Sequence, residues 1–149
     1  MSTAEGPKGN PKLFILAVYK WDEHEPIRLA YAEDLESYQY FERKNVRSDL
    51  QTKCSTIVQN VPPGTKSTLD IKDAFNKDRF CFVEVSQDKI AAVMVTDDSY
   101  PDKAAEIALT KLIMDFRDTF SDNPHVYENA TEDPHLEYPK IKDTFLKDW

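Results

Sequence analysis

The most apolar stretch of the chain lies near its start. Residues 13–19 form a continuous apolar run of strand length, which predicts a central strand covered on both faces. After a polar turn at 22–26, apolar and polar side chains alternate over 27–31, as they do in a half-buried strand. The two segments together predict a β-hairpin.

From residue 46 onward, the apolar positions follow a helical period. One stripe consists of Val46, Leu50, Cys54, Ile57, Val58 and Val61. Asn45 is a suitable N-cap, and the Pro-Pro-Gly sequence at 62–64 ends the helix. We therefore expect an amphipathic helix over 46–61, with charged side chains such as Lys53 on its solvent face.

Three further strands follow this helix. Residues 68–75 alternate weakly, with Leu69 and Ile71 among the apolar positions, and the nearby lysines are typical of a protected edge strand. Two much stronger strands over 80–85 and 90–95 are joined by a short polar turn. These two strands predict a second hairpin.

The last third of the chain is predicted to be helical. Pro101 and the acid that follows it mark a helix entrance, where Asp97 and Asp98 are expected to act as caps. The buried side of this helix would contain Ala105, Ala108, Leu109, Leu112, Ile113, Phe116 and Phe120. A polar, acidic linker over 121–134 leads to a shorter amphipathic helix from Pro139. The apolar side of the shorter helix would contain Ile141, Phe145, Leu146 and Trp149.

The element order ββαβββαα predicts an α+β fold built on a five-stranded, antiparallel-type mixed sheet. Hairpins and one helical crossover connect the strands, so 13–19 and 90–95 should pair in the centre. The strands over 27–31 and 68–75 would then form the edges. We expect the first helix to cover one face of the sheet and the last two helices to cover the other.

Composition limits what such a domain can do. The 149 residues carry a net charge of −8, which disfavours binding to nucleic acid or to an anionic lipid surface. No apolar run is long enough to span a bilayer, and the polar start does not resemble a secretory signal. We expect a flexible tail over 1–11 and one soluble, non-secreted domain over 12–149.

Residues that could carry chemistry are sparse. The three glycines are too scattered for a phosphate-binding loop. His24, His125 and His135 fall in predicted turns or in the linker, without the spacing of a helical metal site. Cys54 and Cys81 fit two buried, reduced thiols. We therefore expect no catalytic activity, no bound metal and no cofactor.

Three segments nevertheless form a recognisable set. They are the Tyr-Gln-Tyr-Phe-Glu-Arg sequence within 38–46, the strand residues 82–85, and the Thr-Asp-Asp-Ser-Tyr-Pro sequence at 96–101, followed by Ala105 and Leu109. In this order and at this separation, they resemble the longin domain of the Ykt-type SNARE proteins, which are lipidated R-SNAREs. The resemblance implies the profilin-like longin fold, whose element order agrees with the one predicted above.

The resemblance also implies a regulatory domain in vesicle-mediated transport, such as ER–Golgi transport, and in membrane fusion. In that family a heptad-repeat SNARE motif and a prenylated C-terminal cysteine motif follow the domain, and this sequence contains neither. The implied partners are the protein's own downstream SNARE motif or lipid group and other SNARE proteins. The implied location is cytoplasmic, with peripheral attachment to Golgi or endosomal membranes through the lipidated C-terminus alone. The isolated domain is expected to be a monomer.

In that family the first helix and the neighbouring edge strand form an apolar groove that receives the SNARE segment or lipid. The corresponding residues of this chain are Val46, Leu50, Thr52, Cys54, Ile57, Leu69 and Ile71. Relatives tend to carry aromatic residues early in the helix, where this chain has Asp49 and Thr52. The loss of those rings predicts a weaker closed state.

Two other functions remain open at this point. One is a non-SNARE longin subunit of a trafficking complex. The other is a small-molecule sensor or minor enzyme on a similar scaffold, which would need an internal cavity with convergent polar groups. The two central strands supply almost no polar groups for such a cavity.

Overall fold

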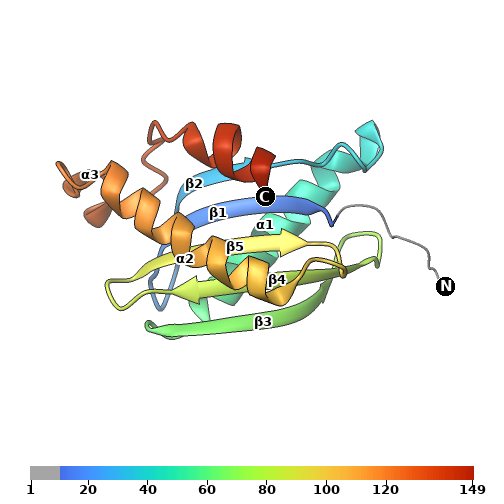
Figure 1. Ribbon diagram of the computed structural model, residues 1–149, viewed down its shortest axis with the longest axis horizontal. Helices are drawn as coiled ribbons and strands as arrows, with labels where there is room; N and C mark the ends of the chain where they lie inside the picture. The colour runs from blue at the N-terminus through green and yellow to red at the C-terminus, as the bar shows by residue number, and fades with distance from the viewer. Residues whose placement is uncertain (1–10) are drawn as a thin grey trace.

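The computed structural model describes residues 11–149 (Figure 1). The tail predicted over 1–11 lies outside the described residues, except for Pro11. The strands are β1 (Leu13–Lys20), β2 (Ile27–Glu33), β3 (Thr65–Lys72), β4 (Asp78–Val85) and β5 (Ile90–Thr96). The helices are the 3₁₀ turn η1 (Tyr40–Glu42), α1 (Arg43–Gln59), α2 (Asp102–Thr119), α3 (His125–Glu128) and the π-helix η2 (Ile141–Leu146).

The five strands form one sheet in the order β2-β1-β5-β4-β3, and every neighbouring pair is antiparallel. The predicted central pair and the predicted edges are therefore confirmed, and the sheet is antiparallel throughout rather than mixed. β1 and β5 are buried along nearly their whole length. Continuous burial is what their unbroken apolar sequences predict for strands covered on both faces.

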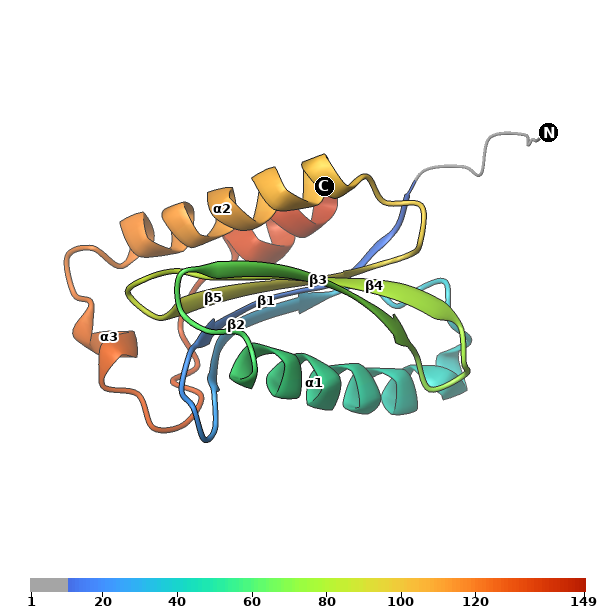
Figure 2. The same ribbon diagram turned by 90° about the horizontal axis from the view of Figure 1, so that it is seen from below.

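Helices cover both faces of the sheet, as predicted. Figure 2 shows α1 on one side, with α2 and the C-terminal helix on the other. The apolar core on the α1 side takes from that helix Val46, Leu50, Cys54 and Val58. The core on the opposite side takes from α2 and η2 the residues Leu109, Leu112, Phe116, Ile141 and Phe145. The sheet therefore separates two apolar cores, one under α1 and the other under α2 and η2.

The start of α1 differs from the prediction. The helix begins at Arg43, and Asn45 lies inside it rather than capping it. The turn η1 precedes the helix, where the Gln39 backbone N–H donates a hydrogen bond to Glu42 Oε1 at 3.1 Å. This local contact sets the start of the helical segment in a turn that has no buried residue. The spacing of apolar residues alone could not locate it.

The edge strand β3 is also displaced from its predicted position, because it covers Thr65–Lys72 rather than 68–75. The residues after Lys72 form a turn in which Asp73 Oδ1 accepts hydrogen bonds from the N–H groups of Phe75 and Lys77, at 2.8 and 2.9 Å. An aspartate that bonds to the backbone ahead of it favours a turn over a strand. Phe75 is consequently exposed and not part of the sheet.

The C-terminal region contains more structure than the predicted linker. Within 121–134 lies the short helix α3, whose Tyr127 is buried and packs against Phe116 at a ring-centroid distance of 5.3 Å. The predicted helix after Pro139 is present as the π-helix η2, with Ile141 and Phe145 buried. The polar composition of 121–134 gave no indication of this fold, because a single aromatic residue, Tyr127, packs the segment against α2.

The entrance of α2 corrects one further expectation. Pro101 is the N-cap residue, and no side chain caps the helix. Asp97 instead organises the preceding loop, where it accepts hydrogen bonds from the backbone N–H groups of Lys12 and Ser99, both at 3.1 Å. Asp98 is exposed. Both acids lie too far before the first helical turn to reach its free N–H groups.

Candidate functional site

The open edge of the sheet at β3 presents backbone hydrogen-bonding groups. Asp73 N–H donates to Lys77 O at 3.0 Å, so these two residues form a hydrogen-bonded pair just beyond the strand. Hydrogen-bonded and non-hydrogen-bonded pairs alternate along an antiparallel ladder. Given the β3–β4 register, the N–H and C=O groups of Lys66, Thr68, Asp70 and Lys72 point away from β4. This row of groups can accept another strand.

Side chains of β3 divide cleanly between its two faces. Leu69 and Ile71 are partly buried and pack against the core beneath α1. The alternate side chains are exposed on the face that carries α2, and they are Lys66, Thr68, Asp70 and Lys72. A strand added at this edge would therefore meet an apolar row on one face and a charged row on the other.

The structure separates the predicted groove residues of α1 into two groups. Val46, Leu50 and Cys54 are fully buried and pack on the sheet, so they form the base of the helix rather than an accessible lining. Thr52 is exposed, and its hydroxyl donates to Ser48 O at 3.0 Å. Ile57 is partly buried against the same core. The accessible apolar residues between helix and edge, which we call the α1–β3 strip, are Ile57, Leu69 and Ile71.

A polar bridge closes one end of the α1–β3 strip. The Lys53 ammonium donates a hydrogen bond to Asp49 Oδ2 at 3.0 Å and another to the outward-pointing carbonyl of Lys72. The helical pattern predicted that Lys53 lies on the solvent face of α1. It could not predict this contact, because Lys72 lies on another element. The contact with Asp49, one helical turn earlier, holds the lysine in place.

A buried polar cluster fixes the same end of β3. Tyr38 Oη donates to Asp73 Oδ2 at 2.5 Å, and Arg79 donates to Tyr38 Oη from Nε and Nη2 at 3.0 and 2.9 Å. Burial raises the pKa of Tyr38 to about 12. Burial alone would raise the pKa of Asp73, but hydrogen bonds from Tyr38, Lys77 and Phe75 hold it below its usual range. The cluster joins the end of β3 to the loop before η1.

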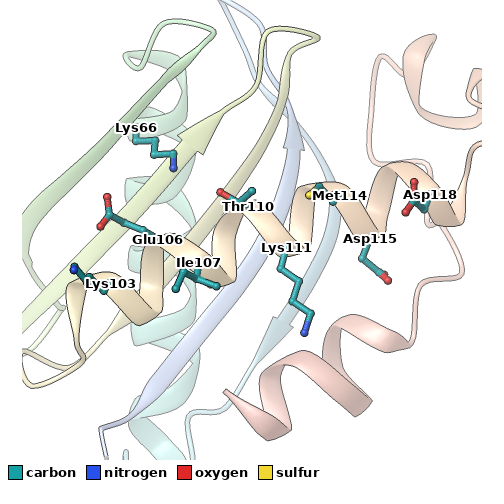
Figure 3. A pocket seen from close by; sticks show the side chains of 9 residues that line it. All are labelled: Lys66, Lys103, Glu106, Ile107, Thr110, Lys111, Met114, Asp115 and Asp118. Atoms are coloured by element: carbon teal, nitrogen blue, oxygen red, sulfur yellow. The ribbon is translucent and has the colours of Figure 1, made fainter.

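A second surface lies on the outer side of α2. Ile107 and Met114 are 69% and 56% exposed there, in an open hollow of about 690 Å³. Figure 3 shows their side chains along the helix, with Lys66 reaching the hollow from the sheet. This surface offers apolar contacts but no row of free backbone groups. It therefore suits a different kind of contact from the edge at β3.

The histidines, cysteines and acids of residues 11–149 were candidates for a metal site. No cluster of three or more His, Cys, Asp or Glu side chains is placed there to hold a metal ion. His24, His125 and His135 are exposed, and Cys54 and Cys81 are buried free thiols, as predicted. None of the helices in this described part combines the length and apolarity needed to cross a bilayer.

Comparison with known proteins identifies the family. Residues 35–143 match the longin family, described as a regulated-SNARE-like domain. The chain is 26% identical over 134 residues to "Synaptobrevin homolog YKT6" of Yarrowia lipolytica, a match that covers 89% of this chain and 63% of the relative. It is 22% identical over 127 residues to "VAMP-like protein YKT61" of Arabidopsis thaliana, covering 83% of this chain and 57% of that protein. The chain thus spans about three fifths of the length of these relatives, and the family match over most of its own length shows that it belongs to the longin family.

Proposed function

We propose that this chain is the regulatory longin domain of a SNARE that acts in intracellular vesicle transport and membrane fusion. In this proposal the domain binds its own SNARE segment or lipid group at the α1–β3 strip. The observation that carries the proposal is the open edge of β3, which lies beside the apolar residues Ile57, Leu69 and Ile71 in a longin-family chain. The relatives named for synaptobrevin and VAMP support the same function.

The geometry supports binding by strand addition. Main-chain hydrogen bonds to the open edge would supply affinity, and apolar side chains on alternate positions would pack against the α1–β3 strip. The strip is short, because Val46, Leu50 and Cys54 are already buried in the core. The Lys53 bridge also occupies the Lys72 carbonyl. We therefore expect micromolar affinity, about −8 kcal/mol or weaker.

An NMR titration tests this site. The probes are synthetic peptides that tile the part of the Yarrowia relative lying outside the match, added to the ¹⁵N-labelled chain. Binding at the α1–β3 strip should shift amide signals mainly within residues 46–60 and 66–75. Shifts confined to 101–120 and 139–149 would contradict the strip and place the contact on the α2 surface of Figure 3.

A charge at the strip provides the decisive variant. Ile57→Glu places a carboxylate where apolar side chains should dock, and it should weaken peptide binding at least tenfold, about 1.4 kcal/mol. Ile107→Glu is the matched control, because it places the same charge on the exposed outer side of α2. Equal losses in both variants would argue against a specific site. Circular dichroism of each variant checks that the domain stays folded.

The partners and location of the full protein follow as part of the same proposal. We expect contact with other SNARE proteins, no nucleic-acid binding, and a cytoplasmic protein that reaches Golgi or endosomal membranes through a lipidated C-terminus. The isolated domain would be a monomer without cofactor or catalytic step. A non-SNARE longin subunit is the second candidate, and the exposed apolar residues on α2 favour it because they would suit a stable protein partner. An absence of amide shifts at millimolar peptide would support that candidate.

A further inference from the structure

Among the charged side chains of β3, Asp70 forms no ion pair within residues 11–149. On the face that carries α2, Lys66 lies opposite Glu84, and Lys66 Nζ is 3.9 Å from Glu84 Oε1. Lys72 lies opposite Asp78, and Lys72 Nζ is 2.5 Å from Asp78 Oδ1. Asp70 lies opposite the aromatic Phe80. The Asp70 carboxylate forms no ion pair with any residue in the described range 11–149. The charges at both ends of the strand are matched within the sheet, and the central one is not.

The place of Asp70 makes it available to an incoming strand. Its N–H and C=O groups are among those that point away from β4, as the hydrogen-bonding register requires. Its side chain is exposed and lines an open hollow of about 410 Å³, whose other lining residues include Phe80, Asp98, Lys72 and Arg79. Lys72 is paired with Asp78 and Arg79 with Asp73. A residue paired directly with Asp70 would project its side chain onto the same face, within about 5.5 Å between the Cα atoms.

We propose that Asp70 selects a lysine or arginine at the directly opposed position of the strand that binds this edge. This inference rests on the proposed function, since it names the chemistry of the partner at the same site. Residues on either side of that basic position would point to the other face, toward Leu69 and Ile71, and they should be apolar. The partner sequence that fits the edge is therefore apolar, basic, apolar, and the opposed charges fix its register.

Another role for Asp70 predicts a different result. A charge on an edge strand also discourages pairing between copies of the same protein. If Asp70 served only that purpose, its removal would promote self-association without changing the charge preference of a bound strand. The two roles are separated by a comparison of peptides that differ at one position.

The experiment uses the intact chain and two short fluorescein-labelled peptides of alternating valine and threonine. They differ only at the central threonine position, which is lysine in one peptide and glutamate in the other. Fluorescence anisotropy should show that the lysine peptide binds roughly fivefold more tightly. Asp70→Asn should remove the difference, and Asp70→Lys should reverse it. Asp98→Asn, which removes the same charge from the same hollow but off the edge strand, should leave the preference intact.

Each outcome bears on one proposal or on both. Equal binding of the two peptides, with amide shifts at residues 66–71, would overturn the role of Asp70 and leave the edge site standing. Loss of the preference in both Asp98→Asn and Asp70→Asn would assign it to the general field of the hollow and would also overturn the pairing. No binding of either peptide to the folded chain would contradict strand addition itself. Reversal by Asp70→Lys, with shifts on β3, establishes the pairing.

Discussion

The two edges of the sheet have very different surroundings. At β2 the π-helix η2 packs over the strand and its neighbour β1, and ion pairs link the strand to distant parts of the chain. Glu33 accepts two hydrogen bonds from Arg47 of α1, at 2.6 and 2.5 Å, and Arg28 pairs with Asp133 at 3.4 Å. These contacts join β2 to three other segments. This edge is therefore tied to the rest of the fold, although most of its residues are only half-buried.

At β3 most of the polar contacts are local. Lys66 and Lys72 pair with residues of the adjacent strand β4, and only Lys53 reaches the edge from α1. The backbone groups between these contacts remain directed outward. Exposed ion pairs of this kind contribute little to stability, typically ~0–1 kcal/mol each. One edge thus stabilises the domain, and the other keeps free the groups that binding a partner strand requires.

The largest effect should come from the core that both edges share. Leu112→Ala removes a fully buried side chain of α2 and should lower the free energy of unfolding by about 2–5 kcal/mol. Denaturant titration measures this loss. The control Met114→Ala truncates an exposed residue of the same helix and should change stability by less than about 0.5 kcal/mol. Similar losses in the two variants would mean that α2 does not pack on the sheet through Leu112.

An intermediate effect is expected at the anchored end of β3. Tyr38→Phe removes the hydroxyl that donates to Asp73, which leaves a buried carboxylate with one donor fewer, at a cost of about 1–3 kcal/mol. Hydrogen exchange measured by NMR should show faster opening of β3 than of β2. An unchanged exchange rate at β3 would mean that the cluster does not hold the edge.

The pH dependence of the same variant gives a second measure. The pKa of Asp73 is held below its usual range in the folded state, so its contribution to stability is present above the unfolded pKa of about 3.9 and is lost as pH falls. The stability difference between the native chain and Tyr38→Phe should therefore shrink below about pH 4. A difference that stayed constant on acidification would contradict the ionised state of Asp73.

The smallest effect concerns the Lys53 bridge at one end of the α1–β3 strip. Lys53→Met frees the Lys72 carbonyl and adds an apolar side chain beside the α1–β3 strip. Peptide affinity in the NMR titration should rise about twofold to threefold, which corresponds to a few tenths of a kcal/mol. Lys103→Met, on the exposed side of α2, removes the same charge and should leave the affinity unchanged.

Much of the architecture could be predicted from local pattern. The unbroken apolar runs of β1 and β5 require burial on both faces, which only the centre of a covered sheet provides. The helical stripe from Val46 to Val58 likewise specified which side of α1 faces the sheet. The boundaries of α1 and β3 could not be predicted as well, because hydrogen bonds made by Glu42 and Asp73 set them rather than apolar burial.

The sequence by itself therefore determined the order of the five strands and of the helices other than α3, because each of these elements is specified by a local pattern of apolar residues. The edge strands could be inferred because they are the less apolar ones. Only the tertiary structure decided which groove residues are accessible. Val46, Leu50 and Cys54 share the apolar character of Ile57, and packing against the sheet buries the first three completely. The same holds for Lys53 and Asp70. The lysine meets a backbone carbonyl of β3, and within residues 11–149 the aspartate forms no ion pair. Local periodicity specifies the face on which a side chain lies, whereas the partner it meets there is set by the folded arrangement.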